Sequence, residues 1–205
     1  MTRVVCVCVE GAPGTGKSAL CAAAATQAAV PVTVLEELYV DVDGAFANDT
    51  RSVRAMSVWV RAWFESVAAA ASAHPRPRLI LSDRGPLSAE LYVTGGEEAR
   101  AAVRAVIAEC TAAHSAVVDV RNVVVTAPPG PPRSRTNAAA VAAGAAVAAG
   151  AAAAGPDAAD AAAAAAALAW AETAARFYES APGWGRVRAG SGRVLAEVLA
   201  LGQRA

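Results

Sequence analysis

The sequence predicts an α/β protein built as a three-layer sandwich, in which a parallel sheet of about five strands carries helices on both faces. Short valine-rich segments alternate with longer helix-forming segments, and this alternation is typical of parallel strands joined by crossover helices. The first valine-rich segment, Arg3–Glu10, is apolar at nearly every position, as expected for a central strand covered on both faces. A glycine-rich turn follows this strand and leads directly into a helix-forming run. The 205 residues fit one such domain, and we interpret residues 1–205 as a single domain.

Apolar runs, helix propensity and proline breakers place the individual elements. Strands are expected at Arg3–Glu10, Val32–Leu35, Leu79–Ser82 and Val117–Thr126. Helices are expected at Lys17–Ala29, from a cap at Asp49 or Thr50 to near Ala73, at Leu87–Tyr92 and at Glu97–Ala113. The C-terminal part predicts a helix at Trp170–Ser180, a strand at Trp184–Ala189 and a last helix at Arg193–Leu201.

Two segments between the fourth strand and the C-terminal elements have unusual compositions. Residues 128–136 form a proline-rich loop that carries two arginines. Residues 138–169 are an alanine-rich segment of low complexity within the same domain, and helix is expected there only after Pro156. The uncharged part of this segment contains no Leu, Ile or Phe, so we expect no association with a membrane.

The charge balance and the cysteine spacing argue against several classes of protein. The formal net charge is zero at pH 7 and the sequence pI is about 6.7, so we expect no nucleic-acid partner and no anionic membrane surface. Cys6, Cys8, Cys21 and Cys110 lack the spacing and the further ligands of a zinc site, and we expect buried, reduced thiols. The first apolar run leads into the glycine turn, not into a cleavage site, so the expected compartment is the reducing cytoplasm.

A phosphate-binding motif occupies the turn after the first strand. It matches the pattern G-x-x-x-x-G-K-[ST] at every position, with Gly11, Ala12, Pro13, Gly14, Thr15, Gly16, Lys17 and Ser18. The glycines let main-chain amides wrap phosphate oxygens, and the helix that follows points its positive end at the same place. Lys17, the only lysine of the chain, is expected on the β- and γ-phosphates, and the Ser18 hydroxyl on Mg²⁺. The motif predicts ATP and Mg²⁺ as cofactors and a fold of the P-loop NTPase type.

Further charged residues follow the predicted strands at their carboxyl ends, where ligands bind in open parallel sheets. They are Glu36 and Glu37 after the second strand, Asp83 and Arg84 after the third, and Arg133 and Arg135 in the loop after the fourth. Phosphoryl transfer uses these residue types, because a carboxylate orients or deprotonates the attacking oxygen and arginines offset the charge of the transferring group. We therefore predict catalytic roles for these residues and a metal-binding pair of Ser18 and Asp83, with the choice of base between the two glutamates left open.

At this point two segments resemble the superfamily of deoxyribonucleoside kinases and thymidylate kinases, which includes viral thymidine kinases. Val9–Ser18 is similar to the first strand and phosphate loop of that family, including the glutamate before the first glycine. Ser82–Val93 is similar to its acidic-Arg-Ser segment. The resemblance implies ATP- and Mg²⁺-dependent phosphorylation of a deoxyribonucleoside at its 5′-hydroxyl, and it implies a homodimer.

The same resemblance implies roles for individual residues. Asp83 and Arg84 would lie at the phosphoryl-acceptor site, one of Glu36 and Glu37 would be the base toward the 5′-hydroxyl, and the loop 128–136 would be the lid. The sequence also departs from the family pattern. No proline follows either glutamate, Gly85 stands where the family has serine or tyrosine, and no glutamine lies on the long helix where the family reads the base. The base preference therefore stays open.

Three alternatives to a deoxyribonucleoside kinase are compatible with the same residues. In a thymidylate-type kinase, the acceptor is a nucleoside monophosphate and Arg84 binds its phosphate. In a P-loop NTPase without a small-molecule acceptor, Leu79–Asp83 is the apolar strand that ends in a Mg²⁺-binding aspartate. In a nucleotide-binding scaffold, the triphosphate binds but no phosphoryl group moves. The first is distinguished by its products and the second by hydrolysis without an acceptor.

Overall fold

The computed structural model describes residues 3–11, 15–36, 51–73, 78–126, 169, 172–174, 176–178, 180, 185–188, 196 and 200. Their elements, in chain order, are β1 (Val4–Glu10), α1 (Lys17–Gln27), β2 (Val32–Leu35), α3 (Val53–Ser72), β3 (Leu79–Asp83), α4 (Leu87–Tyr92), α5 (Gly96–His114), β4 (Val118–Thr126) and β5 (Gly185–Arg188). The sequence predicts each of them at nearly the same bounds. The described positions between 169 and 180 are also helical, as expected.

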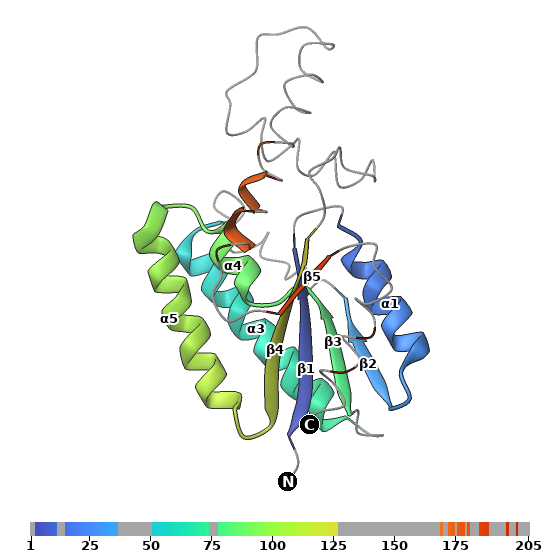
Figure 1. Ribbon diagram of the computed structural model, residues 1–205. Helices are drawn as coiled ribbons and strands as arrows, with labels where there is room; N and C mark the ends of the chain where they lie inside the picture. Colours follow the sequence, from blue (N-terminus) through green and yellow to red (C-terminus); the bar gives the residue numbers. More distant parts are fainter. Residues whose placement is uncertain are drawn as a thin grey trace, which may run out of the picture.

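The strands form one parallel sheet in the order β2-β3-β1-β4-β5. Helices cover both faces, so the predicted fold class is observed (Figure 1). Strand β3 lies between β2 and β1, and the register places Asp83 beside Val9 and Ser82 beside Leu35. Because the strands are parallel, their carboxyl ends meet at one edge of the sheet. The residues that follow β1, β2 and β3 are therefore brought to the same edge.

Strand β1 divides the core into two layers, because successive side chains of a strand point to opposite faces of the sheet. Cys6 and Cys8 pack in the cluster that includes α3 and α5, whereas Val5, Val7 and Val9 pack against α1. Figure 1 shows α1 on one side of the sheet and α3 and α5 on the other. Every residue of β1 is buried, which explains why its sequence is almost continuously apolar.

The start of α3 differs from the prediction. Its N-cap is Ser52, whose hydroxyl oxygen accepts a hydrogen bond from the backbone N–H of Ala55 at 3.2 Å. The expectation that Asp49 or Thr50 caps this helix is therefore wrong. All three residue types are good N-caps, so the sequence alone does not decide among neighbouring candidates.

The cysteines are buried and form no disulfide, as predicted. Burial raises the pKa of the Cys8 thiol well above its usual value and raises that of Cys21 to about 12. Both thiols therefore stay protonated at neutral pH and behave as small apolar side chains. Their role in the molecule is packing.

Several predicted features lie outside the described residues. They are Ala12, Pro13 and Gly14 of the phosphate loop, Glu37, the loop 128–136 with Arg133 and Arg135, and nearly all of the alanine-rich segment 138–169. Among the helices that the structure describes, none has the length and apolar character needed to cross a membrane.

Candidate functional site

The two ends of the phosphate loop have backbone conformations that require glycine. Gly11 has a φ of 144°, and a Cβ at this position would lie 2.5 Å from the carbonyl oxygen of Val125 on β4. Gly16 has a φ of 87° and directly precedes the first residue of α1, Lys17, which is buried. The turn thus passes tightly over the end of β4 and directs the N-terminus of α1 toward the carboxyl edge of the sheet. A helix N-terminus favours anions such as phosphate.

The serine of the motif is joined to the aspartate at the end of β3. The Ser18 hydroxyl donates a hydrogen bond to Oδ2 of Asp83, 65 residues away in the sequence. The pairing of β3 with β1 accounts for this contact, because it aligns Asp83 with Val9, two residues before the loop. The predicted pair of Ser18 and Asp83 is therefore brought together.

These two side chains fit a magnesium ion. The second carboxylate oxygen of Asp83, Oδ1, is buried and makes no hydrogen bond within the described part of the chain. Hydroxyl and carboxylate oxygens are the hard ligands that Mg²⁺ takes, together with water and phosphate oxygens. No group of three or more His, Cys, Asp or Glu that could hold a metal occurs among the residues described. The protein would thus supply part of the coordination, and a bound triphosphate would complete it.

Arg84 has a strained backbone that two neighbouring elements hold in place. Its φ is 75°, a left-handed conformation that is uncommon for residues other than glycine. Its N–H donates to the carbonyl of Val9 at 3.1 Å, and its carbonyl accepts from the Ser82 hydroxyl at 2.6 Å. The Trp63 indole N–H of α3 in turn donates to that hydroxyl at 3.0 Å. Such strain persists only where surrounding contacts impose it, and it concentrates at functional sites.

The guanidinium of Arg84 lies over an aromatic ring at the end of α4. Its Cζ is 5.5 Å from the ring centroid of Tyr92, and the Cζ of Arg51 is 5.9 Å from the same centroid. The backbone N–H of Thr94 donates to the Arg51 carbonyl at 2.9 Å and so ties the chain before α3 to the end of α4. Two cationic side chains therefore meet at one ring beside the Asp83–Arg84 turn.

Close packing explains why residue 85 is a glycine. A Cβ there would lie 2.7 Å from both the Cβ and the Sγ of Cys8, and 3.1 Å from Oε1 of Glu10. No side chain fits at this distance. The departure of Gly85 from the pattern of the resembled family therefore has a local cause, because β1 presents two larger side chains against the turn.

Glu10 is a buried carboxylate at this edge to which the sequence interpretation gave no separate role. Its side chain accepts hydrogen bonds from the Gly85 N–H at 2.9 Å, the Ser88 hydroxyl at 2.6 Å and the Tyr178 hydroxyl at 3.1 Å. Burial raises the pKa of the Glu10 carboxyl, and these hydrogen bonds together with the nearby charge of Arg84 oppose the rise. The signal in the sequence is a glutamate that ends an otherwise apolar strand.

Glu36 occupies a different position from Asp83. It is exposed at the end of β2, which β3 separates from β1, and it makes no hydrogen bond or ion pair with another described residue. Glu37, Arg133 and Arg135 lie outside the described residues. The assignment of the base to Glu36 or Glu37 therefore stays a prediction.

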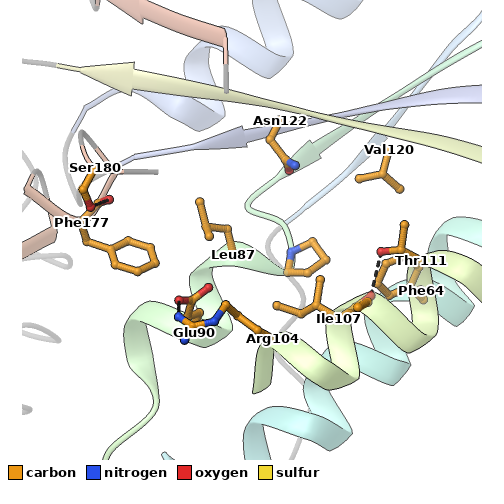
Figure 2. A pocket seen from close by; sticks show the side chains of 12 residues that line it. Phe64, Leu87, Glu90, Arg104, Ile107, Thr111, Val120, Asn122, Phe177 and Ser180 are labelled. Carbon is orange, nitrogen blue, oxygen red and sulfur yellow. Dashed lines mark hydrogen bonds and ion pairs between the residues drawn. The ribbon is translucent and has the colours of Figure 1, made fainter. Parts of the chain in front are cut away.

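A separate cavity of about 630 Å³ lies between α4, α5, β4 and the helical positions near residue 177. Figure 2 shows Leu87 and Phe177 pointing into it, with Asn122 above them on β4 and the ion pair of Glu90 and Arg104 along one wall. None of the predicted site residues lines this cavity, so the cavity and the phosphate site are formed by different residues.

Comparisons with known proteins address the fold. No protein-family model and no curated protein sequence matches this chain. Among solved structures, a NadR protein crystallised with NAD and AMP-PNP has a TM-score of 0.52 and 14% sequence identity, and the match covers 98% of this chain and 49% of that one. A gluconokinase from Sinorhizobium meliloti 1021 has a TM-score of 0.43 and 12% identity over 98% of this chain and 92% of its own.

The likeness to the NadR protein agrees with the predicted fold class, a parallel α/β sandwich with helices on both faces. At 14% identity it shows the fold alone, and this chain spans about half the length of that protein. Membership of the deoxyribonucleoside and thymidylate kinase superfamily stays a prediction.

Proposed function

We propose that the chain is a P-loop phosphotransferase, which binds ATP with Mg²⁺ and transfers the γ-phosphoryl group to the 5′-hydroxyl of a deoxyribonucleoside. One observation carries the phosphotransferase part of this proposal. The Ser18 hydroxyl is hydrogen-bonded to Asp83, and the parallel pairing of β3 with β1 aligns Asp83 with Val9, two residues before the phosphate-loop motif. A serine hydroxyl and a carboxylate that hold Mg²⁺, together with an arginine, are groups that this reaction uses, and Ser18, Asp83 and Arg84 would supply them.

On the donor side, the loop amides and Lys17 would bind the β- and γ-phosphates, as the motif predicts. The Asp83 carboxylate orients the Ser18 hydroxyl, and both would hold Mg²⁺. Magnesium supplies charge neutralisation at the phosphate oxygens when it is bound with the nucleotide. The strand pairing fixes these residues before any ligand arrives, so little reorganisation is required.

On the acceptor side, the hydroxyl oxygen attacks the γ-phosphorus, its proton passes to a carboxylate, and the bond to the β-phosphate oxygen breaks with its electron pair left on ADP. Arg84 would offset the charge of the transferring group. Its backbone is held by β1 and its guanidinium rests on Tyr92, so it is preorganised for this role. One of Glu36 and Glu37 is the proposed base.

A nucleoside monophosphate acceptor is the second candidate, and the paired arginines favour it. Arg51 and Arg84 both lie at the ring of Tyr92, and two guanidiniums suit an anionic group better than a neutral hydroxyl. A thymidylate-type kinase would use them on the phosphate of its acceptor. A homodimer remains part of the proposal through the family resemblance.

Product analysis tests the proposal. The full-length chain is incubated with ATP and MgCl₂, together with thymidine, with thymidine monophosphate or with no acceptor, and products are separated by ion-exchange chromatography. Conversion of thymidine supports the proposal, and conversion of the monophosphate alone supports the second candidate. ADP formed equally fast without any acceptor would identify a hydrolase. The same incubation is repeated with the other three deoxyribonucleosides and their monophosphates. If ATP binds but none of these acceptors is phosphorylated, a kinase is refuted. Lys17→Ala is the control that ties each activity to the loop.

A further inference from the structure

Glu10 links three segments of the chain at the base of the phosphate loop. It is the last residue of β1 and directly precedes Gly11, and its side chain is 0% exposed. Its donors come from the Asp83–Gly85 turn, from the first turn of α4 and from the C-terminal helical segment, through Gly85, Ser88 and Tyr178. A single carboxylate thus contacts the Asp83–Gly85 turn, the start of α4 and the C-terminal helical segment at Tyr178.

The packing around these donors matches the hydrogen bonds. Tyr178 and Ala174 form a buried cluster with Leu87 and Leu91 of α4 and Val124 of β4. Figure 1 shows this helical segment, in orange-red, beside α4. The Tyr178 hydroxyl also lies 3.1 Å from that of Ser88. The C-terminal segment is therefore attached to the site by an apolar contact and by a buried polar contact, both through α4 and β1.

Burying the Glu10 carboxylate costs folding free energy, so its presence needs a reason other than stability. A buried carboxylate loses its hydration, and well-packed apolar residues are often at least as stabilising. Glu10 is 0% exposed, and its side chain is hydrogen-bonded to Gly85, Ser88 and Tyr178, so we assign it no contact with the substrate. What it can do is fix direction, because hydrogen bonds specify the positions of their donors and apolar contacts do so less strictly.

We propose that Glu10 is a positioning residue, which sets the Asp83–Gly85 turn against the phosphate loop and fastens the C-terminal segment at Tyr178 to the same point. The Gly85 N–H follows the strained Arg84 directly, so the Glu10–Gly85 hydrogen bond fixes the orientation of the Arg84 peptide. This inference rests on the proposed function for its kinetic consequences, because it predicts that Glu10 acts on the acceptor side through Arg84. Its structural part is independent of any activity.

The test uses Glu10→Gln and Tyr178→Phe in the full-length chain, with Val67→Ala as a stability-matched control. Val67 is 0% exposed in α3 and belongs to the core cluster of that helix, not to the Glu10 contacts. The amide of Glu10→Gln keeps the volume but cannot accept from all three donors. Because hydrogen bonds to a charged group are strong, the acceptor kcat/KM should fall about 10- to 100-fold. The Kd of a nonhydrolysable Mg²⁺-triphosphate should change less than about threefold.

The graded variants make the outcome decisive. Tyr178→Phe removes one donor and should lower the acceptor kcat/KM by about three- to tenfold, since one hydrogen bond is lost. Val67→Ala should lower the melting temperature and leave the acceptor kcat/KM and the triphosphate Kd unchanged. Glu10→Gln that loses thermal stability while its kinetics stay at wild-type values would overturn the proposal, because Glu10 would then be structural only. Should Glu10→Gln not fold, Tyr178→Phe and Ser88→Ala decide by the same split.

Hydrogen exchange separates a failure of this proposal from a failure of the proposed function. Peptides that cover residues 82–92 and 172–180 should exchange faster in Glu10→Gln than in the wild type, and they should exchange at the wild-type rate in Val67→Ala. This readout needs no substrate. Unchanged exchange in these peptides of Glu10→Gln overturns the positioning role, whether or not the chain transfers a phosphoryl group.

Discussion

Replacing Asp83 by asparagine tests the assignment of the metal site, because the loss of triphosphate affinity should appear only when magnesium is present. The substitution keeps the shape of the side chain and removes its charge. Oδ2 of Asp83 accepts the hydrogen bond from Ser18, and Oδ1 is buried without a hydrogen bond in the described part of the chain. If these oxygens face Mg²⁺, the asparagine removes one hard anionic ligand from the complex. If they serve only to hold Ser18, the metal should not matter.

The two conditions give different magnitudes. With Mg²⁺, the loss of a charge-assisted interaction of about 1.5–3 kcal/mol should weaken triphosphate binding about 10- to 100-fold. Without Mg²⁺, the Asp83 carboxylate opposes the triphosphate, and like charges about 4 Å apart cost about 1 kcal/mol even at the dielectric constant of water. Asp83→Asn should therefore bind metal-free triphosphate as tightly as the wild type, or up to about fivefold more tightly.

Isothermal titration calorimetry with a nonhydrolysable ATP analogue, in MgCl₂ and in EDTA, measures both conditions. Asp119→Asn is the matched control. It also changes an aspartate to an asparagine, but on β4 beside Val5, at the opposite end of the sheet, where Asp119 pairs with Arg121 at 2.8 Å. The control should bind like the wild type in both buffers. If Asp83→Asn weakened binding by the same factor with and without Mg²⁺, or left it unchanged, the assignment of Asp83 to the metal would be wrong.

Two further predictions concern the loop and the buried carboxylate. Gly11→Ala should abolish triphosphate binding and lower the melting temperature, because its Cβ would lie 2.5 Å from the Val125 carbonyl oxygen. The Cβ of Gly16→Ala would meet no atom within 4 Å, so this variant should lose only about 1–2 kcal/mol of folding stability through its φ of 87°. Thermal melts of both variants measure the difference. Denaturant unfolding across pH should show the wild type losing stability relative to Glu10→Gln as pH rises above 4.5. Burial raises the folded-state pKa of Glu10 from 4.5, so the unfolded chain loses this proton at a lower pH than the folded chain does. If the wild type instead lost stability relative to Glu10→Gln as the pH fell, the burial effect would be contradicted.

The elements and the phosphate loop could be predicted because their signals are local. A buried strand, a glycine turn and a helix start each depend on a few neighbouring residues, and the β1–α1 unit contains all three within Val4–Gln27. Asp83 could be placed near the loop by one general rule, that parallel strands bring their carboxyl ends to one edge. That rule also favoured Glu36, but it does not give the strand order. Because β3 and not β2 pairs with β1, Asp83 reaches Ser18 while Glu36 stays exposed one strand further away.

The role of Glu10 could not be predicted because its partners are distant. Its donors lie 75, 78 and 168 residues away in the sequence, and only the fold assembles them. A glutamate at the end of a strand is most often solvated, so the pattern favours the wrong environment. The same holds for Gly85, whose necessity depends on Cys8 across the strand pair and on no neighbour in sequence.

Three locally unfavourable features meet where the Asp83–Gly85 turn packs against the end of β1, and their coincidence is itself an argument for function. A left-handed arginine costs about 1–2 kcal/mol, and a fully buried carboxylate at Glu10 costs several kcal/mol before its hydrogen bonds offset it. Gly85 adds a further cost, because glycine loses more backbone entropy on folding than any other residue type. A chain selected for stability alone has no reason to gather these features beside Gly11. The proposed site, which would hold the Arg84 guanidinium in one direction beside a bound triphosphate, gives such a reason, because strain and buried polar contacts fix direction more strictly than apolar packing does.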